Sequence, residues 1–406
     1  MANNISCVNN CTGCGLCAHI CPKGAIEIKE DILRDHFLYP CINNDQCINC
    51  GLCLKTCPST KKGTELKNNH CFLFKHNNED KLINSSSGGA FQVIAEQIFK
   101  NNKSSVYGAA WNGLKVSHIR ITSVHDLNKL LGSKYIQSYI SKEIYKNIKD
   151  DLINGNHVLF CGTPCQVAAV DAYLPEGLKM NLILVQILCH GVPNQWGFDK
   201  CIEHENRLIH GKINMFEFRH KVSVGTDNRK FIYNYAKSNK TYQVIGDYFF
   251  FPYYRLFHTY SIYRDSCYHC DYRKHRFGDL IVGDFWGISS INRNYKNDYD
   301  KSLIIALSEK GNAVLRLIDV EYICDLNNIA KYNESIFNDV EPKREYADFY
   351  NKISDINFYR QYRIKPNNEK AKAGLRNFAK RILNLLSKKS KRKLLTKITY
   401  NVKCVK

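Results

Sequence analysis

Residues 11–22 read CTGCGLCAHICP, and residues 47–58 read CINCGLCLKTCP. In each stretch three cysteines stand three residues apart, and a fourth follows four residues later with proline behind it. Three thiolates at this spacing wrap a loop around one 4Fe-4S cluster, and the fourth ligates the other cluster. Glycine in the loop lets the backbone approach the inorganic sulfides. The pattern predicts an α+β ferredoxin-like module with two 4Fe-4S clusters over residues 1–62.

Each predicted cluster takes three thiolates from one run and one from the other. The first is assigned to Cys11, Cys14, Cys17 and Cys57, and the second to Cys47, Cys50, Cys53 and Cys21. Disulfides are the alternative in a secreted chain, but no signal peptide is visible at the start. Zinc is a further alternative, although it usually takes two C-x-x-C pairs. Cys7 and Cys41 precede the runs at unequal offsets and are interpreted as buried or spare thiols.

The composition of the whole chain points to a reducing compartment. Its 406 residues should form at least two domains, and they include 19 cysteines. Without a secretory signal, this many cysteines argues for metal ligation in the cytoplasm. No stretch approaches the 18 or so apolar residues that a membrane helix requires.

The net charge of +20 is concentrated at the C-terminus. From Lys365 onward there are 14 Lys and Arg against one acid, which accounts for +13. Apolar residues recur at helical spacing in this region, so residues 346–406 are expected to be a basic amphipathic tail. The tail either lies on an anionic membrane, which would place the protein peripherally at the inner membrane face, or docks on protein. Nucleic acid is not expected as a partner, because the remaining residues are only weakly basic.

Residues 70–345 are predicted to form an α/β domain with a largely parallel sheet. Strands are expected at 106–111, 114–121, 157–160, 182–188, 214–219, 231–235, 279–282 and 302–307, and helices at 90–99, 141–153, 167–173 and 194–208. Strands alternating with helices are typical of this class.

Two glycine-containing segments of this domain are candidate ligand loops. Ser85-Ser86-Ser87-Gly88-Gly89 precedes an apolar-periodic helix, where backbone N–H groups suit a dinucleotide pyrophosphate, although an ordinary helix cap has the same composition. Gly283-Asp284-Phe285-Trp286-Gly287 follows a strand and suggests a loop beside a flat ligand. Its alternative is a packed turn with aromatic anchors.

Four further cysteines are candidates for a third 4Fe-4S cluster. Cys165 and Cys189 follow predicted strands, where open α/β sheets place their sites, and Cys267 and Cys270 form another C-x-x-C. The alternatives are zinc, a dithiol or unrelated buried cysteines.

Taken together and in this order, the motifs resemble the beta-subunit family of coenzyme F-420 hydrogenase/dehydrogenase, in its bacterial branch. The resemblance rests on the ferredoxin runs and on 85–89, 132–138, 162–166, 189–193, 267–270 and 283–287. It implies an iron–sulfur flavoprotein that binds FAD and passes electrons between clusters and a flavin or deazaflavin.

Site residues carried over from the resemblance fall into two groups. The ligands of a cluster next to FAD would be Cys165, Cys189, Cys267 and Cys270, with Cys161 as an alternate. The flavin or substrate contacts would be Ser87, Gly88, Gly89, Ser133, Lys134, Tyr135, Gln137 and Asp284. Lys134 would stabilise negative charge on the reduced ring.

Three hypotheses about function follow. In the first, an oxidoreductase relays electrons from the N-terminal clusters through the third cluster to FAD and a small organic acceptor. In the second, a non-catalytic electron-transfer subunit supplies a redox partner protein. In the third, the chain is an accessory redox protein of a polysaccharide-biosynthesis system.

Overall fold

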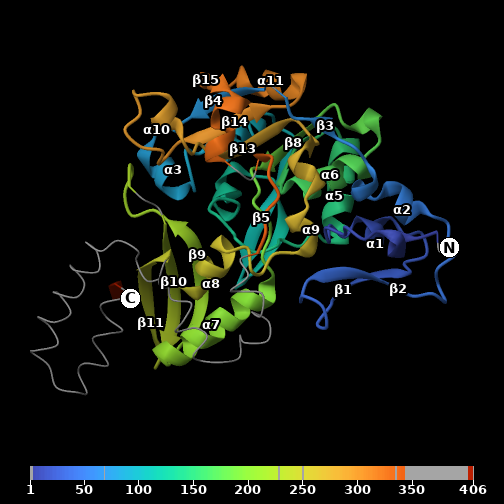
Figure 1. The fold of residues 1–406 in the computed structure, drawn as a ribbon, viewed down its shortest axis with the longest axis horizontal. Helices are drawn as coiled ribbons and strands as arrows, with labels where there is room; N and C mark the ends of the chain where they lie inside the picture. The colour runs from blue at the N-terminus through green and yellow to red at the C-terminus, as the bar shows by residue number, and fades with distance from the viewer. Residues whose placement is uncertain are drawn as a thin grey trace, which may run out of the picture. The chain divides into compact units, whose positions relative to one another are not determined.

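The structure is a computed structural model that describes residues 3–67, 69–226, 229–248, 251–333 and 336–342, together with the backbone of 401–405. The chain divides into two compact units, one formed by 1–195, 221–228 and 263–341, the other by 196–220, 229–262 and 342–406. Each is described by itself (Figure 1). Except for the strand at 401–405, the predicted basic tail lies outside the described residues.

The first unit begins with a small α+β module. Two antiparallel strands, β1 (Ile26–Glu30) and β2 (Leu38–Ile42), pair with Ile26 opposite Ile42. Two short helices, α1 (Leu16–Ile20) and α2 (Leu52–Thr56), follow the cysteine loops, and the 3-10 turns η1 (Ile5–Cys7) and η2 (Pro58–Thr60) flank them. The core of the module is small and includes three of the cysteines, Cys17, Cys53 and Cys57. The predicted ferredoxin-like class of this segment is confirmed.

An eight-stranded mixed sheet forms the rest of the first unit, with the order β15-β4-β14-β13-β8-β7-β5-β6. The strands are β4 (His70–Phe74), β5 (Ser104–Asn112), β6 (Lys115–Ile121), β7 (His157–Gly162), β8 (Leu182–Ile187), β13 (Leu280–Asp284), β14 (Ser302–Ala306) and β15 (Glu321–Asp325). The four central strands β13, β8, β7 and β5 run parallel, and the pairings outside them are antiparallel. The predicted α/β class is confirmed, with the parallel pairing at the centre of the sheet.

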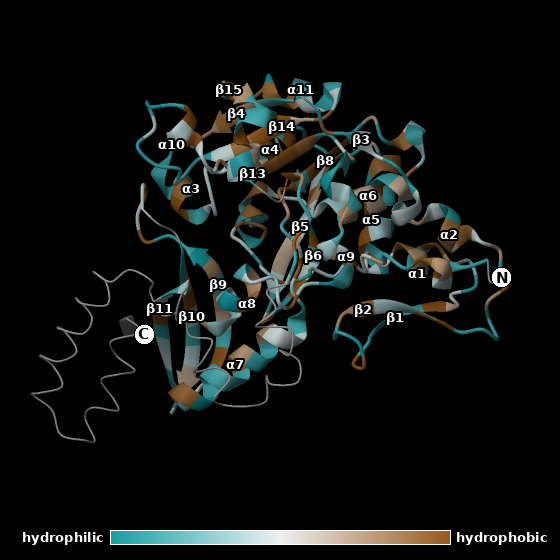
Figure 2. Ribbon diagram, viewed as in Figure 1, coloured by the Kyte–Doolittle hydropathy of each residue, from teal (hydrophilic) through white to brown (hydrophobic). Residues whose placement is uncertain are grey.

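Helices cover both faces of this sheet. One face packs against α4 (Ala90–Ile98) and α11 (Glu309–Leu315), and the other against α5 (Lys142–Ile153) and α6 (Pro164–Tyr173). Further along, α10 (Ile288–Ile291) and α12 (Leu326–Ile329) enclose the core around β4, β13 and β14. Figure 2 shows the apolar colouring of strands in the middle of the sheet, which agrees with burial on both faces.

Short elements complete the first unit. These are β3 (Thr64–Glu65), which pairs with β12 (His275–Arg276), α3 (Glu79–Asn84), η3 (Val124–Lys129), η4 (Glu176–Leu178), α9 (Asp265–Tyr268), η6 (Asp271–Arg273) and η7 (Ala330–Tyr332). Leu16 of α1 packs in the same core as α5, so the cysteine-rich module is anchored on the large sheet's helical layer.

The second unit has its own antiparallel sheet, with the order β16-β11-β10-β9. Its elements are α7 (Gln195–Ile209), β9 (Lys212–His220), β10 (Lys230–Lys237), β11 (Lys240–Asp247), α8 (Pro252–His258) and β16 (Asn401–Val405). Its core is aromatic: the rings of Phe198, Phe216 and Phe251 pack together, with centroids 4.9–6.3 Å apart. No helix in the described part of the chain is long and apolar enough to cross a membrane.

Candidate metal centres

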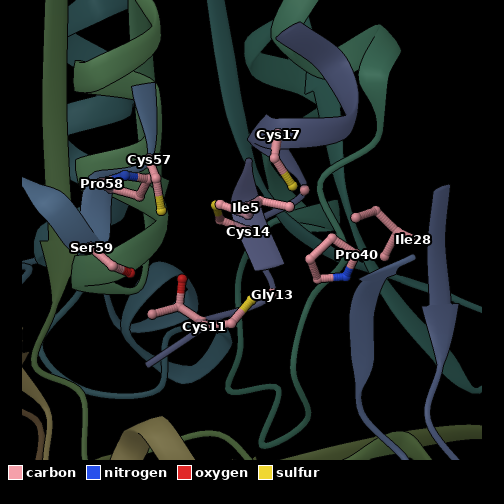
Figure 3. A pocket seen from close by; sticks show the side chains of 12 residues that line it. Ile5, Cys11, Gly13, Cys14, Cys17, Ile28, Pro40, Cys57, Pro58 and Ser59 are labelled. Carbon is pink, nitrogen blue, oxygen red and sulfur yellow. The ribbon is translucent and has the colours of Figure 1, made fainter. Parts of the chain in front are cut away.

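The first cavity of the N-terminal module is lined by four cysteines. Cys11, Cys14 and Cys17 come from the first run and Cys57 from the second, and Figure 3 shows their sulfurs turned toward one space. Apolar side chains and prolines, among them Ile5, Ile28 and Pro40, form the remaining wall.

The second cavity has the reciprocal composition. Cys47, Cys50 and Cys53 line it together with Cys21. Each run therefore gives three thiols to its own cavity and one to the other, which is the grouping that crossing ligands require.

Left-handed glycines shape both loops. Gly15 and Gly51 precede α1 and α2 with φ of 78° and 73°, and at each the following helix begins directly. A side chain at Gly51 would meet the Asn3 amide within 3.0 Å. Glycine thus gives the tight turn that brings the third cysteine of each run back toward the first two.

The thiols of the first cavity are strongly desolvated. Burial, together with the neighbouring Cys11 and Cys57 sulfurs, raises the pKa of Cys14 to about 12. Burial also raises the pKa of Cys17 and Cys57, so without a metal Cys14, Cys17 and Cys57 are neutral at pH 7 and iron must displace their protons. An all-thiol, largely apolar cavity fits the donor preference of a 4Fe-4S cluster.

A second group of four cysteines lies at the carboxyl edge of the parallel strands. Cys165 is in the first turn of α6, Cys189 follows β8, and Cys267 and Cys270 lie in and just after α9. The Cys165 thiol is buried, which raises its pKa, and it also interacts electrostatically with the other three sulfurs. Burial likewise raises the pKa of Cys189 to about 11 and of Cys267 to about 12. The four predicted ligands are therefore brought together.

The alternate ligand, Cys161, lies elsewhere. Its thiol is in the core beneath α4, where burial raises its pKa to about 12 and the Lys134 ammonium opposes that shift. Among the described residues no three His, Cys, Asp or Glu side chains are arranged to hold a metal ion. A four-iron cluster separates its thiolates more widely than a single ion does, because sulfides and irons lie between them.

Two buried tyrosines lie between the first cavity and the four-cysteine group. Tyr272 interacts electrostatically with Cys165 on one side and with Cys14 and Cys57 on the other. Tyr145 donates a hydrogen bond to the Cys14 carbonyl at 2.9 Å, and it also interacts electrostatically with the Cys165 sulfur. The two groups of thiols are thus neighbours through one layer of aromatic side chains.

The predicted pyrophosphate loop is occupied by the protein itself. Gly88 N–H donates to the Ser302 hydroxyl at 2.8 Å, and Ser87 donates to the Lys301 carbonyl at 2.7 Å. A side chain at Gly88 would meet the Phe74 carbonyl oxygen at 2.2 Å, so packing against β4 explains this glycine. Gly89, with φ of 90°, caps α4. The Ser87 hydroxyl and the Gly88 N–H are therefore not free to bind a phosphate.

The remaining flavin candidates also have internal roles. Ser133 bonds to Ser86 at 2.9 Å, which joins the two predicted loops, and Lys134 donates to the Leu130 and Leu131 carbonyls. Tyr135 is half-buried in the same segment. Asp284 ends β13 opposite Ser302 and is half-buried.

Gln137 connects the cysteine-rich module to the α/β sheet. Its amide donates to the Thr12 carbonyl at 2.9 Å and accepts from the Arg264 guanidinium at 3.1 Å. A connecting role accounts for this residue without a ligand.

Sequence reasoning missed three buried arginines around the second group of cysteines: Arg264, Arg273 and Arg276. Their only signal in the sequence is proximity, since all three lie within six residues of Cys267 or Cys270.

Comparisons with known proteins match both parts of the chain. Residues 10–61 match the model of the 4Fe-4S dicluster domain, and residues 155–331 match the model of the C terminus of the coenzyme F420 hydrogenase/dehydrogenase beta subunit. A similar solved structure is the xenon-derivatised nickel–iron F420-reducing hydrogenase complex from Methanosarcina barkeri. It is 14% identical with a TM-score of 0.44, covering 68% of this chain and 90% of that one. No curated protein matches.

The two family matches confirm the predicted resemblance and an iron–sulfur redox role. The chain thus joins a segment similar to the 4Fe-4S dicluster domain, at 10–61, to a segment similar to the C terminus of the coenzyme F420 hydrogenase/dehydrogenase beta subunit, at 155–331.

Proposed function

We propose that this protein is a three-cluster electron carrier, in which Cys165, Cys189, Cys267 and Cys270 hold a third 4Fe-4S cluster. The observation that carries the proposal is the convergence of these four partly buried cysteines from three separate segments of the chain. An all-sulfur donor set favours iron–sulfur chemistry over harder metals.

The arrangement supports an ordered route for electrons. The second cavity is connected to the first by the exchanged cysteines, and the first cavity borders the third group through Tyr272 and Tyr145. Electrons that enter the N-terminal module would pass inward to the third cluster, and from there to a redox partner protein or a small organic acceptor.

FAD as the acceptor rests on the resemblance of 132–138 and 283–287 to the family's segments. The Ser87 hydroxyl and the Gly88 N–H already donate hydrogen bonds inside the protein, and Gly88 packs against the Phe74 carbonyl, so these two donors do not fit a pyrophosphate in this structure. Within the chain the proposed route therefore ends at the third cluster, and the flavin content of the protein is to be measured independently of iron.

Anaerobic reconstitution with iron, sulfide and FAD tests the proposal. We expect about twelve irons per chain, and three reduced-cluster signals by EPR during stepwise reduction. Cys189→Ser should lower the iron content to about eight, because one of three clusters loses a ligand. Wild-type protein with about eight irons would contradict a third cluster.

Two cysteine variants serve as matched controls. Cys201→Ser alters a buried thiol of the second unit, and Cys161→Ser alters the alternate ligand. Both should keep about twelve irons if the assignment is correct. If Cys161→Ser loses a cluster while Cys189→Ser keeps all its iron, Cys161 and not Cys189 is the ligand of the third cluster.

A further inference from the structure

The four-cysteine group is surrounded by buried positive charge. Arg264, Arg273 and Arg276 are only 1%, 3% and 2% exposed. A charged guanidinium is rarely buried unless an anion compensates it, because desolvation of an unpaired ion is costly.

Arg276 lacks a carboxylate partner among the described residues. Its guanidinium reaches the Gln186 side-chain oxygen at 3.5 Å and the Ile336 carbonyl at 3.2 Å, both of which are neutral. Its Nε is buried without a hydrogen-bond partner in the described part of the chain. Burial lowers its pKa to about 10, so the group remains charged at pH 7.

Arg273 lies beside Arg276 and is bonded to the backbone of the cysteine loops. It donates to the Cys267 carbonyl at 2.9 Å and to the His190 carbonyl at 3.1 Å. Its carboxylate neighbour, Asp339, is 3.5 Å away and half-exposed, which makes it a weak counter-ion. The two guanidinium groups repel each other, and both interact with the sulfurs of Cys189 and Cys270.

Arg264 is the third cation and contacts the first cysteine loop and β2. It donates to the Cys11 carbonyl at 3.2 Å and the Leu38 carbonyl at 2.8 Å, and it stacks over Phe37 and Tyr39. No carboxylate within the described ranges pairs with it. Its charge acts on the Cys267 sulfur as well.

We infer that Arg273 and Arg276, together with Arg264, are the counter-ions of an anionic cluster at the four cysteines and raise its reduction potential. The inference rests on the proposed third cluster. A 4Fe-4S cluster with four thiolates is already anionic, and reduction adds one electron and one negative charge without forming or breaking a bond. Fixed cations nearby stabilise the reduced form more than the oxidised form, because its charge is larger. Cations at this site would therefore favour reduction of the third cluster by electrons from the N-terminal clusters.

An EPR-monitored redox titration of the reconstituted full chain tests the inference with Arg276→Gln and Arg276→Lys. Arg276→Gln should disfavour reduction of one cluster about tenfold, a drop of about 59 mV in its midpoint potential, and leave the other two unchanged. Arg276→Lys keeps the charge and should stay near the wild-type potential. Arg120→Gln is the matched control, since Arg120 is already paired with Asp151 at 2.6 Å and should shift no potential.

The outcomes separate this inference from the proposed function. Three results would overturn the counter-ion role. They are an unchanged potential in Arg276→Gln, an equal shift in both Arg276 variants, and equal shifts of all three clusters. If Arg276→Gln loses the third cluster, retention by Arg276→Lys supports the role of charge, and loss from both variants overturns it. Absence of a third cluster from wild-type protein would instead defeat the proposed function.

Discussion

His118 is a buried histidine held in the neutral form. Its Nδ1 lies 2.5 Å from the Ser138 hydroxyl and its Nε2 lies 3.1 Å from the Cys161 carbonyl, while its ring stacks on Phe160. Burial lowers its pKa from 6.5 to about 4. Such a residue links the stability of the sheet to pH, because protons bind the unfolded chain first.

The free energy of unfolding should therefore fall as pH decreases from about 6.5 to about 4. The folded pKa is lowered, so the stabilisation is complete above the unfolded pKa and is lost as pH falls toward the folded one. The shift corresponds to about 3 kcal/mol at most. Urea unfolding of apo protein across this range, compared with His118→Gln, measures it. An equal pH slope in both proteins would contradict the assignment.

At the scale of single residues, the sequence predicted the cysteine ligands but did not predict the buried arginines around them. The spacing of Cys11, Cys14 and Cys17 is enough to predict cluster ligation, because a loop of that length wraps one cluster. Nothing local distinguishes Arg276 from a surface arginine, since its burial depends on segments around Gln186 and Ile336, far away in the sequence. The same holds for Gly88, whose role depends on close packing against β4 and β14.

Among the elements, the turn after β8 places two of the predicted ligands. Gly191 has φ of 132°, and a side chain there would lie 2.2 Å from the Tyr263 ring and 3.2 Å from the Cys267 Cβ. Glycine is needed both for the backbone conformation and for the close approach of α9. The spacing between Cys189 and Cys267 thus depends on one residue that ligates nothing.

Gly191→Ala should reduce the iron content from about twelve to about eight while the two N-terminal clusters remain. Gly132→Ala is the control, because Gly132 also has positive φ, at 79°, but open space around its Cα. Its variant carries the same kind of backbone strain without a clash and should keep all three clusters. Iron analysis and EPR of both variants check this. Full iron in Gly191→Ala would show that the turn tolerates a side chain.

Elements with strong local patterns were predicted well. β5, β7 and β8 are buried apolar runs, and α5 begins at a serine cap, Ser141, that accepts from the Ile144 N–H. β4, β11 and β15 were missed. β4 has five residues and acquires its place between β14 and β15 from pairings more than 200 residues away in the chain. In the separate sheet, β9, β10 and β11 pair as consecutive antiparallel strands, with Lys237 of β10 opposite Lys240 of β11, and only β16 joins from far along the chain.

For the whole molecule, the N-terminal module should depend on its metal. Its core is small and is partly made of cysteine side chains. In such modules the free energy of metal binding is part of the free energy of folding. The large sheet has extensive apolar cores of its own and should persist without iron.

Removal of iron by an anaerobic chelator should therefore lower the Tm and expose the amides of residues 3–60 to hydrogen exchange first. A loss of about 1 kcal/mol shifts the Tm by about 2–4 °C in a domain of roughly 150–250 residues, and by less in a larger unit. Hydrogen exchange by mass spectrometry, with peptides from β7 and β8 as the internal reference, measures the order. Simultaneous exchange of both regions would indicate that the module and the sheet unfold together.

The order of the ligands along the chain has a consequence for synthesis. All eight predicted cluster ligands of the N-terminal module have been synthesised once the ribosome has added Cys57, whereas the four-cysteine group is complete only when Cys270 has been added. Because chains fold from the N-terminus as they emerge, the two outer clusters can be loaded during translation. The inner site, together with the arginines around it, is complete only once most of the polypeptide has been made.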